Sequence, residues 1–284
     1  MTVGELLDEL ADALAGPHVP PARADARDLI AALLDTPRFW PSANRARPID
    51  EHTEGAIRAA AARLMRGMPM PYAVGKAAFR HLTLAVDARV LIPRPETEVL
   101  VDLALMASGG VGTIADICTG SGCIALALAA EGSYDRVIAT DVSPDALEVA
   151  RGNLTAISEA RRPLLEFRQG DLLAPLRGER VRTIVSNPPY ISPAEAGDLP
   201  AAVRDWEPHL ALFSDADGMA AIRTLVAGAP DVLQPGGVLL MEVDSTRARL
   251  VRDVVEGDPH YRGVEIRLDL TGRERFVVAR RKES

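Results

Sequence analysis

The sequence predicts an α/β fold: a doubly wound, mostly parallel sheet with an antiparallel hairpin at one edge, preceded by a small helical bundle. Two observations support this fold class. Beyond about residue 93, short apolar runs alternate with glycine- or proline-containing turns and helical segments, which is typical of parallel strands covered by helices. Before about residue 72, apolar residues recur at helical spacing. With 284 residues the chain approaches the size limit of one core, so we expect one large and one small domain.

A helical N-terminal domain is expected over residues 1–72. Its helices are predicted at residues 3–14, 22–34 and 51–65. Gly16-Pro17 should end the first helix, because proline cannot continue one. Residues 67–72 are dense in glycine and proline, so this segment is the expected hinge to the rest of the chain.

A β-hairpin linker is expected over residues 73–92. Residues 79–86 alternate apolar and polar side chains, and Val90-Leu91-Ile92 forms a further β-like run. The linker should therefore join the helical bundle to the sheet domain.

The sheet domain is expected over residues 93–284. Its parallel strands are predicted at residues 113–118, 136–140, 165–169, 181–186 and 238–243, with helices starting near residues 96, 123, 144, 218 and 245. Two last β-like runs, at residues 264–270 and 275–279, flank Thr271-Gly272-Arg273 and predict the antiparallel edge hairpin.

Composition and charge exclude several classes of protein. Hydrophobic content of 48% and charged content of 25% are those of a globular protein that buries a core. A net charge of −8 argues against a large positively charged surface for binding nucleic acid. No apolar run is long enough for a membrane span and the N-terminus has no signal-peptide pattern, so we expect a cytoplasmic monomer. The spacing of the only two cysteines, Cys118 and Cys123, matches no zinc site, and no metal is expected.

Three loops should meet where the carboxyl ends of the strands lie, which is the ligand position in open α/β sheets. The segment 116–122 (Asp-Ile-Cys-Thr-Gly-Ser-Gly) brings backbone close to a ligand at a helix N-terminus. Asp141 ends the next strand, where an acid can bind both ribose hydroxyls. Gly170-Asp171-Leu172 follows the third strand and can bracket an adenine ring. Alternatively, the glycine segment is only a tight structural turn, and the aspartates are helix N-caps.

Asp116 favours one nucleoside cofactor over another. A carboxylate four residues before the first glycine repels a pyrophosphate but suits the ammonium and sulfonium groups of S-adenosylmethionine. A strand-end acid that binds only backbone amides is the alternative. The candidate cofactor-binding residues are Asp116, Cys118, Thr119, Gly120, Ser121, Gly122, Asp141, Val142, Asp171, Leu172 and Asn187.

The tetrapeptide Asn187-Pro188-Pro189-Tyr190 follows the predicted strand 181–186 and is the candidate catalytic loop. Two prolines fix φ and remove two backbone donors, so the loop leaves the sheet. The Asn187 side-chain oxygen and the Pro188 carbonyl can then hold an NH2 group, while Tyr190 lies against the attached planar group. A proline-rich turn with a surface tyrosine is the alternative.

These motifs, with others in the same order, resemble the HemK/PrmC family of protein glutamine methyltransferases, and the resemblance covers nearly the whole chain. The most specific match is Ile92-Pro93-Arg94-Pro95-Glu96-Thr97-Glu98. The other matching segments are 66–69 with Tyr72, 119–125, 141–144, 170–172, 186–191, 207–208, 211–212 and 217–218.

The resemblance implies a Rossmann-like class I methyltransferase domain that uses S-adenosylmethionine. It implies that residues 119–122, Asp141, Leu172 and Asn187 contact the cofactor and that residues 187–190 also hold a glutamine amide. It further implies that the N-terminal domain helps to hold class 1 peptide chain release factors. The methyl acceptor in that family is the glutamine of their Gly-Gly-Gln loop, which acts in translation termination.

Three positions depart from the family pattern. Cys118 stands where glycine is usual, Val243-Asp244-Ser245-Thr246 replaces the usual glycine and glutamine after Glu242, and Phe213-Ser214-Asp215 takes the place of a glycine pair. Other substrates therefore stay open: another protein, a small-molecule amide or acid, or the amino group of a nucleic-acid base. A binding module without catalysis is the remaining alternative.

For the reaction we expect an in-line transfer of the methyl group to the amide nitrogen, driven mainly by placement of the two reactants. No histidine or glutamate is evidently placed as a general base. Arg94 and Glu96 are candidate substrate-binding residues at the mouth of the site, and an ion pair that fixes their loop is the alternative role.

Overall fold

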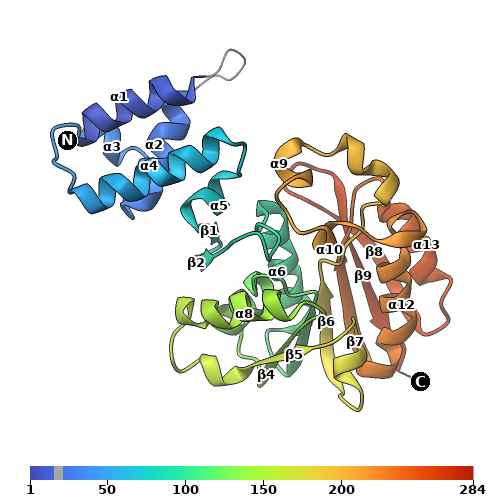
Figure 1. The fold of residues 1–284 in the computed structure, drawn as a ribbon. Helices are drawn as coiled ribbons and strands as arrows, with labels where there is room; N and C mark the ends of the chain where they lie inside the picture. Colours follow the sequence, from blue (N-terminus) through green and yellow to red (C-terminus); the bar gives the residue numbers. More distant parts are fainter. Residues whose placement is uncertain (16–21, 284) are drawn as a thin grey trace. The chain divides into compact units, whose positions relative to one another are not determined.

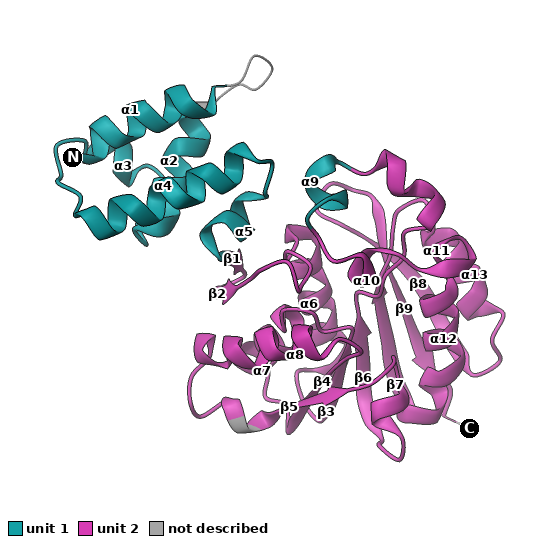
Figure 2. Cartoon of the chain, in the orientation of Figure 1, with its two compact units in different colours: residues 1–76, 200–206 teal, residues 77–199, 207–284 magenta. Residues whose placement is uncertain are grey.

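The computed structural model describes residues 1–15 and 22–283 (Figure 1). The chain forms two compact units, coloured teal and magenta in Figure 2. Unit 1 contains residues 1–76 and 200–206, and unit 2 contains residues 77–199 and 207–284. Residues 200–206 thus cluster with the helical unit, although they lie far along the sequence. The helix stop expected at Gly16-Pro17 lies outside the described residues.

Unit 1 is built from helices, and the apolar faces of α1, α2 and α4 form its core. The helices are α1 (Val3–Leu14), α2 (Ala22–Leu33), α3 (Trp40–Ala43), α4 (Glu51–Met65), α5 (Met70–Val74) and α9 (Ala201–Arg204). Thr2 and Glu5 form a capping box that starts α1, and Asp50 caps α4. Leu6 of α1, Leu29 of α2 and Ile57 of α4 are completely buried together. The three long helices predicted for this region are therefore present with nearly the expected bounds.

The expected hinge and linker differ from the prediction in two places. Residues Met70–Val74 form the short helix α5 instead of an irregular hinge, because Pro71 occupies its first turn, where proline needs no backbone donor. The hairpin consists of β1 (Lys76–Phe79) and β2 (Leu82–Ala85). The β-like run Val90–Ile92 is not a strand: the Ile92 amide donates to the Glu207 carboxylate at 3.3 Å, and prolines at positions 93 and 95 prevent a ladder.

Unit 2 contains a sheet of seven strands in the order β5-β4-β3-β6-β7-β9-β8. The strands are β3 (Thr113–Ile117), β4 (Arg136–Asp141), β5 (Leu165–Gln169), β6 (Val181–Ser186), β7 (Leu233–Glu242), β8 (Tyr261–Leu268) and β9 (Glu274–Arg281). The first five strands pair in parallel, and β9 is antiparallel to both β7 and β8. The predicted fold class is confirmed, and β9 inserts between β7 and β8.

Helices cover both faces of this sheet. They are α6 (Pro95–Ser108), α7 (Cys123–Glu131), α8 (Pro144–Gly152), α10 (His209–Leu212), α11 (Asp215–Gly218), α12 (Ala220–Val232) and α13 (Ala248–Glu256), with short 3-10 turns at Asn153–Ala156, Arg162–Leu164, Ala174–Leu176 and Pro193–Asp198. α6 and α7 bury Leu100 and Leu126 against one face, and α12 and α13 bury Leu225 and Val251 against the other. Two apolar layers therefore hold the strand ends in fixed positions.

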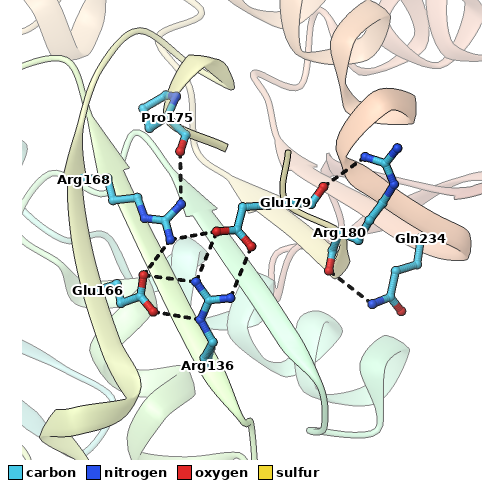
Figure 3. A network of polar contacts seen from close by, with 7 residues as sticks. All are labelled: Arg136, Glu166, Arg168, Pro175, Glu179, Arg180 and Gln234. Carbon is cyan, nitrogen blue, oxygen red and sulfur yellow. Dashed lines mark hydrogen bonds and ion pairs between the residues drawn. The ribbon is translucent and has the colours of Figure 1, made fainter. Parts of the chain in front are cut away.

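An ion-pair network joins neighbouring parts of the sheet edge (Figure 3). Arg136 of β4 binds Glu166 of β5 at 2.8 Å and Glu179 at 3.2 Å. Arg168 of β5 binds the same two carboxylates at 2.6 and 2.8 Å. The bond from Arg136 is the main reason that the pKa of Glu166 falls to about 2. The network connects the loop before β6 to β4 and β5, two strands that do not neighbour β6 in the sheet.

Candidate functional site

A cavity of about 380 Å³ opens at the carboxyl ends of β3, β4 and β6. The chain order of the strands reverses between β3 and β6, which is where open α/β sheets bind ligands. The lining includes the predicted residues Arg94, Cys118, Thr119, Gly120, Ser121, Asp141, Val142, Asp171, Leu172, Asn187 and Pro189. Glu96, Asp116, Gly122, Pro188 and Tyr190 were also predicted and are not among the lining residues.

The glycine turn after β3 needs left-handed backbone at three positions. Gly120 and Gly122 have φ of 55° and 81°, and Cys118 adopts φ of 63° with a side chain that makes this conformation costly. A Cβ on Gly122 would lie 3.2 Å from the Cβ of Ala150, so glycine lets α8 approach the turn. Cys118 therefore has a backbone conformation that glycine would adopt at lower cost.

Asp141 holds the turn in place while it lines the cavity. Its two carboxylate oxygens accept from the Gly120 amide at 2.9 Å and from the Ser143 amide at 2.9 Å. Burial raises the pKa of Asp141, and these amide donors oppose the rise. Asp141 therefore lines the cavity and is not the N-cap of α8, which is Ser143.

Asp116 lies behind the glycine turn and not on the cavity wall. It is completely buried, and its Oδ2 accepts from the Thr119 hydroxyl at 2.6 Å and the Ala125 amide at 3.1 Å. Burial raises the pKa of Asp116 to about 7, although both bonds oppose the rise. Its Oδ1 has no hydrogen-bond partner among the described residues. This unpaired oxygen lies behind the wall of an acidic cavity. Its position suits the binding of a positively charged ligand.

Leu172 and Gly170 shape the wall beyond β5. Leu172 has a left-handed backbone with φ of 44°, and its carbonyl accepts from the Thr140 hydroxyl at 3.4 Å. A Cβ on Gly170 would lie 2.6 Å from Pro175, so glycine is required there. Asp171 is exposed between them and lines the cavity, as expected for a group that meets the nucleoside.

The loop after β6 splits its four residues between two environments. Asn187 and Pro189 line the cavity, and Pro188 is buried. Asn187 Nδ2 donates to the Thr97 hydroxyl of α6 at 3.4 Å. Tyr190 packs against the apolar layer below α12 and α13, and burial, with the nearby Glu242, raises its pKa to about 12. Tyr190 therefore supports the loop from behind in this structure.

The segment before α12 closes over the same loop. The Ser214 amide donates to the Ile191 carbonyl at 2.9 Å. Three successive residues, Ala216, Asp217 and Gly218, then have left-handed φ. A Cβ on Gly218 would lie 2.2 Å from the Tyr190 carbonyl oxygen, so only glycine fits this position. The Asp-Gly pair therefore sets how closely this segment approaches the catalytic loop.

Arg94 lines the cavity and forms an ion pair with Glu207, not with Glu96. Glu207 is 3% exposed and also accepts from the Ile92 amide. The pair thus joins the Ile-Pro-Arg-Pro segment to the loop before α10, which supports the alternative, loop-fixing role of Arg94. Glu96 is partly buried outside the lining.

Sequence reasoning missed four polar residues that hold the site together. Thr97 and Glu242 are buried near the loop 187–190, Glu207 is buried beside Arg94, and Asn153 joins the Ser121 carbonyl to β2 through its amide. Glu242 carried the clearest signal, because an acid ends an otherwise apolar strand. Within the described residues, no group of histidine, cysteine or acidic side chains could hold a metal, and no helix could cross a membrane.

Two solved methyltransferase structures share the fold of this chain. A methyltransferase from Pyrococcus furiosus aligns with 73% of this chain and 92% of its own, with a TM-score of 0.52 and 18% identity. The catalytic domain of hMettl16 aligns with 83% of each chain, with a TM-score of 0.56 and 12% identity. These likenesses show the fold alone. The match of residues 96–201 to the methyltransferase small domain defines the class, a methyltransferase that uses S-adenosylmethionine.

The particular family follows from closer sequence matches. Residues 5–75 match the PrmC N-terminal domain and residues 96–201 the methyltransferase small domain. The release factor glutamine methyltransferase of Moorella thermoacetica is 40% identical over all of both chains. Those of Cereibacter sphaeroides and Mycolicibacterium smegmatis are 39% and 41% identical over 99% and 94% of both chains. The chain belongs to the PrmC/HemK family of release factor glutamine methyltransferases.

Proposed function

We propose that this protein transfers a methyl group from S-adenosylmethionine to the side-chain amide nitrogen of a glutamine in the Gly-Gly-Gln loop of class 1 peptide chain release factors. The observation that carries the proposal is the shared cavity of Asn187 and the glycine turn at the ends of adjacent strands. The full-length relatives are named for this substrate.

Asn187 holds the acceptor amide in this proposal. Its Nδ2 is occupied by Thr97, which leaves Oδ1 as the atom that accepts from the glutamine NH2. The Pro188 carbonyl is the second acceptor. Polarising both N–H bonds and aligning the nitrogen lowers the barrier to its alkylation, and the proton passes to solvent.

The cofactor is held by the turn after β3 and by the loops after β4 and β5. Asp141 binds the ribose hydroxyls, while Asp171 and Leu172 bracket the adenine. The bound cofactor supplies a methyl carbon attached to a positively charged sulfur. Asp116 acts through the Thr119 hydroxyl and the start of α7, and a cationic ligand beside it would favour its ionised form.

The helical unit is proposed to recognise the release factor. Its match to the PrmC N-terminal domain over residues 5–75 supports this role. We also propose that the enzyme acts as a cytoplasmic monomer without direct contact to nucleic acid.

The test is incubation with methyl-labelled S-adenosylmethionine and, in separate reactions, a class 1 release factor, total RNA or small amides. We expect label on the loop glutamine, and none on a release factor whose loop glutamine is replaced by alanine. Asn187→Ala should lower kcat at least about 100-fold, because an oriented acceptor at the reacting centre is lost. Label that appears only on RNA or only on a small amide would overturn the proposal.

A further inference from the structure

One arginine side chain joins two segments that border the loop 187–190. Arg247 immediately precedes α13, and its side chain is only 12% exposed. Its Nε donates to the Asp217 carbonyl of α11 at 2.9 Å, and its Nη2 donates to the Glu195 carboxylate at 2.5 Å. Glu195 lies in the 3-10 turn Pro193–Asp198, which follows the loop. All of these residues belong to unit 2.

The first segment, α11, packs directly against the end of the loop. A Cβ on Gly218, its last residue, would lie 2.2 Å from the Tyr190 carbonyl oxygen and 2.8 Å from Arg247 Nε. Gly218 is therefore enclosed between the loop and the guanidinium. Ala216 and Asp217 have left-handed backbone, which is costly for residues with a side chain. The bond from Arg247 fixes the carbonyl of one of these two residues, so it holds α11 against the loop.

The second segment is fastened two residues after Tyr190. Glu195 Oε2 accepts from the Ser192 amide at 2.9 Å as well as from Arg247. The Ser192 amide and, after it, Arg247 lower the pKa of Glu195, so the carboxylate is ionised at neutral pH. Hydrogen bonds between ionised groups are shorter and stronger than neutral ones. One carboxylate therefore connects Arg247 to the backbone that leaves the loop.

A tight turn after β7 presents Arg247 to both segments. The Asp244 carboxylate accepts from the Thr246 amide at 2.8 Å, and the Asp244 carbonyl accepts from the Arg247 amide at 2.9 Å. An aspartate that accepts from the backbone two residues on is typical of such turns. The turn fixes the backbone of Arg247 at the start of α13, from which its guanidinium reaches α11, drawn beside α13 in Figure 2.

We propose that Arg247 is a positioning residue that aligns the loop 187–190 for methyl transfer by fastening residues 192–195 and 215–218 to each other. The inference rests on the proposed function, in which this loop holds the acceptor amide. A displacement of about 1 Å in a group that positions a reactant can cost on the order of 100-fold in rate. Loss of Arg247 should therefore act on the chemical step, since the glycine turn that holds the cofactor follows a different strand.

The experiment measures kcat, the KM for the release factor, cofactor affinity and melting temperature. Arg247→Met keeps the stem of the side chain and removes both hydrogen bonds, so kcat should fall about 10- to 100-fold. The KM and the cofactor affinity should stay within about threefold of wild type, because the groups that bind the two ligands remain. Glu195 is 41% exposed, so the ion pair adds little stability and the melting temperature should fall by no more than about 4 °C.

Two further variants test the geometry of the guanidinium. Arg247→Lys presents a single ammonium in place of a planar fork and should reach only one of the two acceptors at a time. Its kcat should lie at least about threefold above that of Arg247→Met. Glu195→Gln should keep most of kcat, because its amide oxygen can still accept from both partners. Glu195→Ala releases one of the two segments and should lower kcat about 3- to 10-fold.

Arg249→Met is the matched control. Arg249 lies on the same helix and binds Glu274 through Nε at 2.9 Å and Nη2 at 3.0 Å, so it also loses a two-nitrogen ion pair when replaced. Neither residue of this pair contacts the two fastened segments through a hydrogen bond given for the described residues. Arg249→Met should leave kcat within about twofold of wild type.

The outcomes separate this inference from the proposed function. If Asn187→Ala is inactive but Arg247→Met stays within threefold of wild-type kcat, positioning is wrong and the proposed function stands. An equal loss of kcat in Arg249→Met would also reject positioning. If Arg247→Met does not fold, Glu195→Ala decides, and a kcat within twofold of wild type overturns the inference. If the wild-type enzyme places no label on the loop glutamine, the proposed function fails and the inference fails with it.

Discussion

Cys118 carries the backbone strain of the glycine turn. A left-handed residue with a side chain costs roughly 1 to 2 kcal/mol, and glycine avoids most of that cost. The side chain is also partly buried, and burial raises the pKa of its thiol, so the residue is an unreactive packing group. Cysteine at this position is thus tolerated at a cost to stability.

We therefore predict that Cys118→Gly is more stable than Cys118→Ala by about 1 kcal/mol, although glycine is normally the less stable of the two. Both variants lose the thiol, and only glycine relieves the strain. Urea unfolding of the two variants measures the difference. An alanine variant as stable as the glycine variant would show that the turn is not strained.

Asp116 makes stability depend on pH in the direction opposite to that of a salt-bridged acid. Its folded pKa of about 7 lies above the unfolded value of 3.8, so the folded protein binds an extra proton between these values. Its contribution to stability is fully present below the unfolded pKa and is lost as pH rises through about 7. Glu242, with a folded pKa of about 7, acts in the same direction.

Asp116→Asn should make the unfolding free energy less dependent on pH between 5 and 7, by up to about 1.4 kcal/mol per pH unit. The asparagine oxygen can still accept from Thr119 and Ala125, so the fold should persist. Denaturant unfolding of the cofactor-free protein at several pH values checks this. Equal slopes for variant and wild type would mean that Asp116 stays ionised in the folded protein.

At the scale of elements, the network of Arg136, Glu166, Arg168 and Glu179 links β4, β5 and the loop before β6 (Figure 3). The paired side chains of Arg136 and Glu166 are 37% and 39% exposed, so solvent screens their attraction. Their contribution is present above the unfolded pKa of Glu166 and lost as pH falls towards 2.

A double-mutant cycle of Arg136→Met and Glu166→Gln should give a coupling energy of about 0.5 to 1 kcal/mol. Raising the salt concentration from 0.1 to 1 M should reduce it, because the pair is partly exposed. The unfolding free energies of the four proteins supply the cycle. A coupling that salt leaves unchanged would contradict this view of a screened network.

At the scale of the whole molecule, the cavity belongs to unit 2 alone, since every lining residue comes from residues 77–199 or 207–284. Cofactor binding should therefore stabilise this unit directly. The helical unit has its own core in α1, α2 and α4 and can gain stability only indirectly.

S-adenosylmethionine at 100 times its dissociation constant should stabilise unit 2 by about 2.7 kcal/mol, which raises its melting temperature by about 5 to 10 °C. Differential scanning calorimetry measures the shift. NAD at the same concentration is the control and should give no shift, because the acidic cavity repels its pyrophosphate. A shift with NAD alone would contradict the choice of cofactor.

The sequence by itself determined the strand and helix succession of the sheet domain, the three long N-terminal helices and the position of Asn187 at the end of a buried strand. These features depend on local periodicity and on helix breakers, which act within a few residues. The position of the Asn-Pro-Pro-Tyr loop after this strand was predictable for the same reason.

Only the tertiary structure decided that residues 90–92 form no strand, that β9 lies between β7 and β8, and that Asp116 and Tyr190 stand behind the cavity. It also decided the partners of Arg94 and Asn187, which lie 113 and 90 positions away in the chain. Such pairings depend on which elements the packed core brings together, and no local pattern encodes that choice.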